Sequence, residues 1–169
     1  MHAVDRCPWG REDHANDMAT TILIADDDTV SRKLLRRLLE QDGHTVRAAS
    51  NGREALELFR EEPSDVVLLD IVMPELDGIS VLEQLKATPG TEHVPVIMIS
   101  AVDETDSVVR CIEKGADDYL PKPFNPVILR ARINAGLAKK RLRDLERARP
   151  NDPGFFKSRE FHWHWERPA

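Results

Sequence analysis

Two patterns of apolar and polar positions alternate along this chain. Short, largely apolar runs are separated by longer stretches in which apolar residues recur every three or four positions. The runs are typical of strands buried within a sheet, and the longer stretches are typical of amphipathic helices. These patterns predict strands over 20–25, 44–49, 65–69, 94–100 and 116–120, and helices over 30–41, 53–61, 78–87, 103–114 and from 126 onward.

The order of these segments predicts the fold class. Strand and helix alternate five times, with turn residues such as Gly43, Pro63 and Gly115 between them. Such alternation produces right-handed crossovers and a parallel sheet that helices cover on both faces. We therefore expect an α/β fold, a five-stranded doubly wound parallel sheet of flavodoxin-like order 2-1-3-4-5, with an extended C-terminal helix.

Chemically distinctive side chains follow four of the five predicted strands. Asp26 and Asp27 follow the first strand, Asp70 follows the third, Ser100 ends the fourth, and Lys122 comes shortly after the fifth. These four strands are neighbours in the expected sheet, so their carboxyl ends converge at one edge. The sequence thus predicts a cluster of three carboxylates, one hydroxyl and one ammonium group, placed where open α/β sheets bind ligands.

Such a cluster suits phosphoryl chemistry around a cation. Neighbouring carboxylates repel one another unless a cation lies between them, and Mg²⁺ prefers oxygen ligands. A carboxylate can attack phosphorus to form an acyl phosphate, while a lysine offsets the charge of the phosphoryl group. Each residue also has an ordinary explanation, because Asp and Ser are common turn and cap residues. The agreement of residue types at four strand ends favours the functional interpretation.

The same segments resemble a known family. The chain is similar to the receiver domain of two-component response regulators over roughly residues 20–137. The segments that carry the resemblance are ILIADDD at 22–28, VLLDIVMPELDG at 67–78, PVIMISA at 95–101 and GADDYLPKPF at 115–124.

The resemblance implies a phospho-acceptor and a metal site. Asp70 would accept a phosphoryl group from a sensor histidine kinase, a phosphotransfer protein or a small phosphodonor. Asp26 and Asp27 would bind Mg²⁺ together with Asp70 and the backbone carbonyl of Val72. The protein would then be a signalling module whose only chemistry is self-phosphorylation and autodephosphorylation, rather than an enzyme.

The resemblance also implies a conformational switch. Ser100 would be the switch hydroxyl and Lys122 the lysine that pairs with the phosphoryl group, with a cis bond between Lys122 and Pro123. Tyr119 would turn inward as Ser100 moves toward the phosphate. The alternative for Tyr119 is an ordinary, half-exposed aromatic residue on a strand.

Two valines bear on the fate of the phosphoryl group. Val72 and Val102 stand two residues after the acceptor and two after the switch hydroxyl, where family members differ in autodephosphorylation. Neither side chain can orient an attacking water, so we expect a long-lived phosphoryl group. Val72 also weighs against an aspartyl-nucleophile phosphohydrolase of similar topology, which would carry a second acid at that position.

We divide the chain into a leader (1–17), a receiver domain (18–137), a helical extension (138–149) and a tail (150–169). Met18 is interpreted as a natural start, and the leader before it is of cloning, annotation or natural origin. The extension continues a heptad pattern that predicts either a dimer-forming coiled coil or an ordinary amphipathic helix. The tail is interpreted as a truncation scar, a vector sequence or a docking peptide. The heptad positions are Ile128, Ala131, Ala135, Ala138, Leu142 and Leu145.

The composition of the chain bears on its binding partners and on the compartment in which it acts. The 169 residues are 41% hydrophobic and 32% charged, with a net charge of −6, so we expect no direct binding to nucleic acid or membrane. Cys7 and Cys111 are the only cysteines, which favours a reducing cytoplasm. The output stays open between a stand-alone adaptor and the receiver part of a larger cyclase, phosphodiesterase or kinase protein. A DNA-binding output would have to come from elsewhere.

Overall fold

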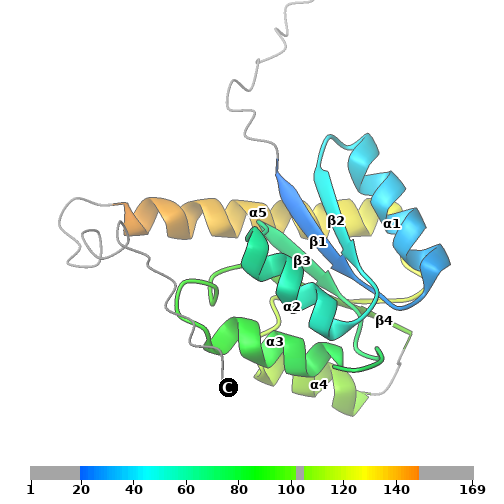
Figure 1. Ribbon diagram of the computed structural model, residues 1–169. Coiled ribbons are helices and arrows are strands. Elements are labelled where there is room, and N and C mark those ends of the chain that lie inside the picture. Colours follow the sequence, from blue (N-terminus) through cyan, green and yellow to red (C-terminus); the bar gives the residue numbers. More distant parts are fainter. Residues whose placement is uncertain (1–19, 102–104, 149–169) are drawn as a thin grey trace, which may run out of the picture.

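The structure is a computed structural model that describes residues 20–101 and 105–148. The predicted leader, the tail, Val102 and the final residue of the predicted extension lie outside the described residues. Strands and helices alternate along the described part (Figure 1): β1 (Thr21–Ala25), α1 (Thr29–Gln41), β2 (Thr45–Ala49), α2 (Gly52–Glu61), β3 (Val66–Leu69), α3 (Gly78–Ala87), β4 (Val96–Ser100), α4 (Thr105–Glu113), β5 (Asp118–Pro121) and α5 (Pro126–Arg147).

The five strands form one parallel sheet of order β2-β1-β3-β4-β5, which confirms the predicted fold class. Alternate side chains of each strand point to opposite faces of the sheet. On one face Ile22 and Val66 pack with residues of α1 and α5. On the other face Leu23 and Val67 pack with residues of α2, α3 and α4. Both faces of the central strands are therefore buried, and this explains their unbroken apolar runs.

Several predicted boundaries were wrong by a few residues. Gly52, predicted in a turn, is the first residue of α2, because Asn51 caps the helix by accepting the N–H of Glu54. Val94 was predicted in a strand, but its N–H bonds back to the Thr91 carbonyl, and β4 begins at Val96. The last strand was predicted over 116–120 and instead spans Asp118–Pro121. A proline is tolerated there because β5 is an edge strand.

Helix α5 continues past the sheet without a break, as the pattern predicted, and ends at Arg147. Its buried residues are Leu129, Ile133 and Leu137. Its basic residues bind groups near the amino ends of the strands. These contacts are Lys139 with Asp117 (3.4 Å), Lys140 with Asp65 (3.4 Å), Arg143 with the His93 carbonyl (3.3 Å) and Arg147 with Glu92 (3.4 Å). None of the described helices has an apolar stretch of the length that a bilayer crossing requires.

Asp117 joins three elements at this end of the sheet. Its carboxylate accepts hydrogen bonds from the Nζ of Lys86 in α3 at 2.9 Å and from the N–H of Val96 at 2.9 Å. Burial would raise the pKa of Asp117, but the Val96 N–H and the charge of Lys86 outweigh it and lower this pKa below its usual range. The ionised carboxylate is therefore favoured by the fold.

We expect Asp117→Asn to lower the free energy of unfolding at pH 7 by about 1–3 kcal/mol, the value of a hydrogen bond to a charged group. Because folding depresses this pKa, the contribution of Asp117 is complete above the ordinary value of 3.8 and is lost as the pH falls from there through the lower pKa of the folded state. Urea denaturation at several pH values checks this. Glu57→Gln, at an exposed position of α2, serves as the control. A stability difference that does not shrink below about pH 4 would contradict the assignment.

Candidate functional site

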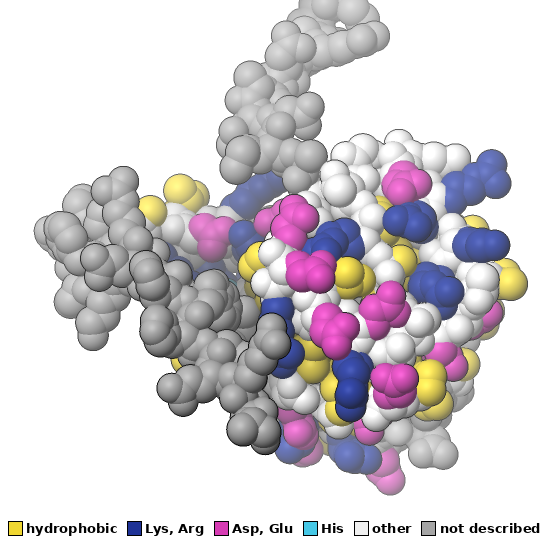
Figure 2. Space-filling model, viewed as in Figure 1, with side chains coloured by type: hydrophobic (Ala, Val, Ile, Leu, Met, Phe, Trp, Pro, Cys, Tyr) yellow, Lys and Arg dark blue, Asp and Glu magenta, His cyan; other side chains and the backbone are white. Residues whose placement is uncertain are grey.

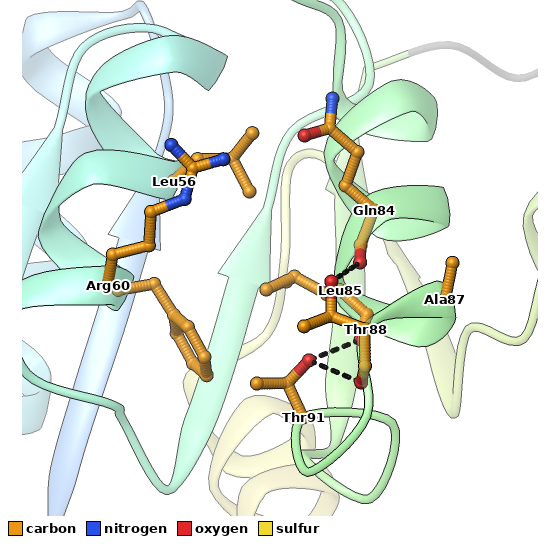
Figure 3. A pocket seen from close by; sticks show the side chains of 8 residues that line it. Leu56, Arg60, Gln84, Leu85, Ala87, Thr88 and Thr91 are labelled. Carbon is orange, nitrogen blue, oxygen red and sulfur yellow. Dashed lines mark hydrogen bonds between the residues drawn. The ribbon is translucent and has the colours of Figure 1, made fainter. Parts of the chain in front are cut away.

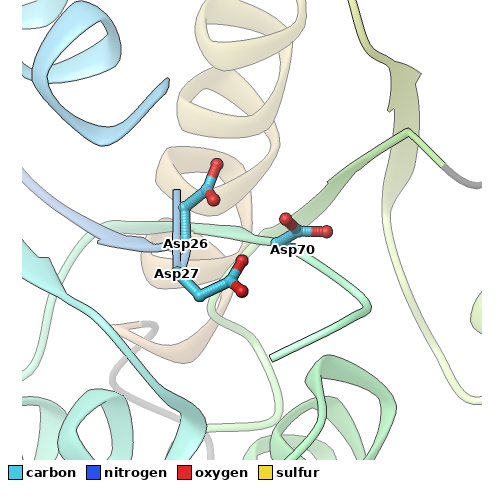
Figure 4. A group of neighbouring side chains, drawn as sticks. All are labelled: Asp26, Asp27 and Asp70. Carbon is cyan, nitrogen blue, oxygen red and sulfur yellow. The ribbon is translucent and has the colours of Figure 1, made fainter. Parts of the chain in front are cut away.

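Three carboxylates meet at the carboxyl edge of the sheet (Figure 4). The N–H of Asp70 bonds to the Ala25 carbonyl at 2.9 Å, and the N–H of Asp26 bonds to the Ala49 carbonyl at 3.1 Å. Hydrogen bonding between strands thus fixes both residues just beyond β3 and β1. Carboxylate oxygens of Asp26, Asp27 and Asp70 lie within 4.8 Å of one another, as the sequence predicted.

Lys122 bridges two of these carboxylates. Its Nζ lies 2.7 Å from Oδ2 of Asp26 and 2.9 Å from Oδ2 of Asp70. Asp26 is only 2% exposed and Asp70 only 7%, whereas Asp27 is exposed to solvent. The ammonium therefore offsets the repulsion between two buried carboxylates, while Asp27 keeps the cluster open to the outside.

Burial and charge act in opposite directions on the pKa values of this pair. Burial is the largest influence on Asp70 and raises its pKa, against the opposing effect of Lys122. Burial would lower the pKa of Lys122, but its hydrogen bonds to Asp26 and Asp70 outweigh this and raise it. Because folding raises the pKa of Asp70, its ionisation opposes folding. A cation bound beside Asp70 would reverse that effect.

The three carboxylates fit a hard divalent cation. Mg²⁺ is bound in proteins by oxygen ligands, usually one or two carboxylates together with waters and phosphate oxygens. Asp26, Asp27 and Asp70 supply such oxygens close together, and Asp27 is exposed to solvent. The backbone N–H of Val72 is near enough to the Asp70 carboxylate to favour its ionised form, and this lowers its pKa against the larger effect of burial.

Ser100 and Tyr119 lie on the same face of the sheet. Ser100 is 1% exposed at the end of β4, two residues beyond Met98, so it shares the face of Met98. Tyr119 of β5 is in register with Met98 and packs partly buried against the cluster that contains it. The two residues assigned to the switch are thus near neighbours along one side of the β4–β5 pair.

The turn after β5 places Lys122. The N–H of Lys122 bonds to the Ser100 carbonyl at 2.9 Å, which extends the β4–β5 pairing by one residue. The bond between Lys122 and Pro123 is cis, as predicted. The backbone of Ser100 therefore positions the lysine that bridges the carboxylates.

Two contributors to the site were missed in the sequence. Arg32, in the first turn of α1, donates from Nη1 to the carbonyls of Asp26 (2.8 Å) and Asp27 (3.4 Å) and so fixes the acidic loop. Gly78 donates its N–H to the Ile71 carbonyl at 2.8 Å, and a Cβ at Gly78 would overlap the Asp70 carbonyl. An Asp-Gly pair is typical of a turn, but the close approach of Gly78 to Asp70 can be seen only in the fold.

The family model of the response regulator receiver domain matches residues 22–134.

The chain belongs to the response regulator receiver family.

Response regulator MprA of Mycobacterium ulcerans is 42% identical over 131 residues, which cover 78% of this chain and 56% of that protein. The "Probable transcriptional regulator ycf27" of Guillardia theta is 44% identical over 118 residues, 70% of this chain and 45% of that protein. This receiver chain thus spans about half the length of these relatives.

Solved receiver structures have the same fold. A CheY-like receiver domain protein from Methanospirillum hungatei JF-1 superposes with a TM-score of 0.70 at 29% identity, covering 74% of this chain and 98% of that chain. The signal receiver domain of a histidine kinase from Syntrophus aciditrophicus superposes with a TM-score of 0.67 at 33% identity, covering 71% and 91%.

We expect Gly78→Ala to lower the free energy of unfolding by about 1–3 kcal/mol, because the added methyl group meets the backbone of Asp70 rather than a flexible side chain. Urea denaturation measures this change. Ser80→Ala, two residues along α3, leaves the backbone bond to Asp77 in place and should change stability by less than about 0.5 kcal/mol. Equal denaturation midpoints for Gly78→Ala and the parent would contradict the close approach.

Proposed function

We propose that this receiver domain accepts a phosphoryl group on Asp70 with the help of Mg²⁺ and thereby changes conformation or association to control an output. The observation that carries the proposal is the meeting of three carboxylates and one ammonium group at a single edge of the sheet. Lys122 contacts both Asp26 and Asp70, and the choice of Asp70 as the acceptor follows from the resemblance to the receiver family.

The proposed reaction is a displacement at phosphorus. A carboxylate oxygen of Asp70 attacks the phosphorus of a phosphohistidine, the P–N bond breaks, and the leaving imidazole takes up a proton. Lys122 then pairs with the phosphoryl oxygens and offsets part of their charge. Asp26 and Asp27, with Asp70 and the Val72 carbonyl, would hold Mg²⁺, which supplies further positive charge at the phosphoryl group.

The phosphoryl group would bias the Ser100–Tyr119 pair. The Ser100 hydroxyl can donate to a phosphoryl oxygen, and any movement of Ser100 alters the packing available to Tyr119 on the same face. Two alternative packings of this pair give the protein two states whose populations the phosphoryl charge shifts. The face formed by α4, β5 and α5 would then carry the signal.

An apolar rim near the site suits a protein phosphodonor. Val30 and Leu34 of α1 are 75% and 48% exposed, and Val72, two residues after the acceptor, is 60% exposed. Exposed apolar side chains near a polar site favour binding of another protein. We propose a histidine kinase or phosphotransfer protein as this partner and the cytoplasm as the compartment, since the two cysteines offer no disulfide framework.

Helix α5 supports a homodimer better than contact with nucleic acid. Ile128, Leu142 and Leu145 of the heptad are 44%, 63% and 68% exposed, so the apolar stripe lies on the outer face of the helix. The basic residues Lys139 and Arg147 instead bind acidic groups of the same domain. Figure 2 shows acidic and basic side chains interspersed on the visible face, with no broad basic surface.

The proposed output takes one of two forms. We infer either a stand-alone adaptor or the receiver part of a larger cyclase, phosphodiesterase or kinase protein. The relative named as a probable transcriptional regulator is matched over 118 residues, which are 45% of its length. A DNA-binding output would therefore have to reside outside the matched residues.

Mg²⁺ binding should depend on the acidic cluster. We expect Asp27→Asn to weaken Mg²⁺ binding roughly tenfold or more, because it removes one charged oxygen ligand. Asp28→Asn is the matched control, since Asp28 caps α1 by accepting the Val30 N–H at 3.1 Å and Asn caps equally well. Isothermal titration calorimetry measures both. Equal losses in the two variants would assign the effect to net charge alone.

Phosphorylation should occur at Asp70 and persist. With Mg²⁺ and acetyl phosphate we expect a mass gain of one phosphoryl group, absent in Asp70→Ala. Phosphate release should be slow because the Val72 side chain cannot orient water.

Sedimentation with beryllofluoride and Mg²⁺, which mimic the acyl phosphate, should show a shift toward a dimer.

The controls separate the parts of this proposal. No mass gain in the parent, or an equal gain in Asp70→Ala, would overturn Asp70 as the acceptor. Loss of phosphate within seconds would overturn the long lifetime. An unchanged sedimentation coefficient with beryllofluoride would overturn dimerisation as the output while leaving the phospho-acceptor assignment intact.

A further inference from the structure

An apolar groove lies between α2 and α3, on the face of the sheet that does not contact α5 (Figure 3). Its volume is about 370 Å³, which is within the range of sites that hold a small ligand or an aromatic anchor. Leu56 and Phe59 of α2 form one wall and Leu85 of α3 forms the other. The groove is separate from the acidic site, and no step of the proposed phosphoryl transfer uses it.

The threonines of the groove present their methyl groups to it. The Thr88 hydroxyl donates to the Gln84 carbonyl at 2.7 Å, and the Thr91 hydroxyl donates to the Leu85 carbonyl at 2.6 Å. Figure 3 shows both side chains on the α3 side of the groove, pointing toward α2. Because their hydroxyls are satisfied by backbone carbonyls, the wall is more apolar than its residue types suggest.

The end of α5 lies close to one end of this groove. Arg147, the last residue of α5, contacts Glu92 at 3.4 Å, and Glu92 directly follows Thr91 in the wall of the groove. The chain therefore leaves its last helix beside the loop that closes the groove. The eight residue steps from Arg147 to Phe155 span up to roughly 26 Å when extended.

The sequence that follows α5 is rich in aromatic residues. Five of the nine Phe, Tyr and Trp residues in the chain stand between positions 155 and 165: Phe155, Phe156, Phe161, Trp163 and Trp165. The basic residues Lys157 and Arg159 are interspersed with the acidic Glu160. Each aromatic side chain buries about 150–250 Å² when it packs, so a segment of this composition gains most from an apolar groove.

We propose that residues 155–165 of this chain bind in the groove between α2 and α3 of the same molecule, with aromatic side chains against Leu56, Phe59 and Leu85. The exit point beside Thr91 raises the local concentration of the segment at the groove far above that of a separate molecule. Arg60 stands at the groove, where its guanidinium can stack on an aromatic ring.

Methyl NMR of the full chain tests this proposal without reference to phosphorylation. The methyl signals of Leu56, Leu85 and Thr88 should shift when the five aromatic residues of 155–165 are all replaced by Ser, because ring currents are lost. Exposed methyl groups of Leu34 on α1 should keep their shifts. In the parent chain, nuclear Overhauser effects should connect the groove methyls to ring protons of the segment.

A substitution in the groove provides the reciprocal test. Thr88→Glu places a charge in the apolar wall and should abolish the Overhauser effects to the segment, whereas Thr105→Glu, at an exposed position of α4, should retain them. Retention of the effects in Thr88→Glu, or identical groove shifts in the parent and the Ser variant, would overturn the proposal. Effects that disappear on dilution would place the segment in a second copy and would also overturn it.

Discussion

The interaction on which the site depends is the double ion pair of Lys122. Parallel strands bring the buried carboxylates of Asp26 and Asp70 to one edge of the sheet, where they would repel each other. The ammonium group reaches both within 2.9 Å because the turn after β5 is held to the Ser100 carbonyl. The lysine is therefore a structural element of the site as well as its proposed phosphate partner.

The acidic site carries negative charge that its own residues balance only in part, and a cation or a phosphoryl group would change that balance. The pKa of Asp70 is raised although Lys122 contacts it. The ion pair with Lys122 therefore does not fully offset the free-energy cost of burying the ionised carboxylate. The exposed Asp27 adds a third negative charge at the opening. A divalent cation would relieve this repulsion, and phosphorylation would change both the charge and the partners available to Ser100.

Helix α5 has two different faces, and they explain why its sequence is ambiguous. Leu129 and Ile133 pack on the sheet, while Leu142 and Leu145 stay exposed. Basic residues of α5 bind groups at the amino ends of the strands and anchor the helix there. The end of the helix is thereby held at the loop beside the groove between α2 and α3. The exposed apolar stripe of α5, proposed to bind a second copy, and the groove, proposed to bind residues 155–165, are therefore fixed in position relative to each other.

Local pattern was sufficient to predict the fold and the acidic cluster. The apolar runs predicted five buried strands, and their order predicted a parallel sheet, which places Asp26, Asp70 and Lys122 at one edge whatever the details of the loops. Boundaries such as the starts of β4 and β5 were less accurate, because hydrogen bonds in the adjoining turns decide them. Apolar residues at those ends are equally compatible with a strand or a packed turn.

Contacts between distant segments were decided only by the tertiary structure. No periodicity indicates that Arg32 holds the carbonyls of the acidic loop, that Gly78 must lack a side chain to approach Asp70, or that Asp117 joins α3 to β4. The groove is likewise invisible in the sequence, since it depends on where α2 and α3 separate and on which way the Thr88 hydroxyl turns. The sequence by itself determines which segments are strands and helices and which groups their ends carry, because these follow from local patterning. Distances, burial and pKa shifts belong to the tertiary structure, because they arise between residues far apart in the chain.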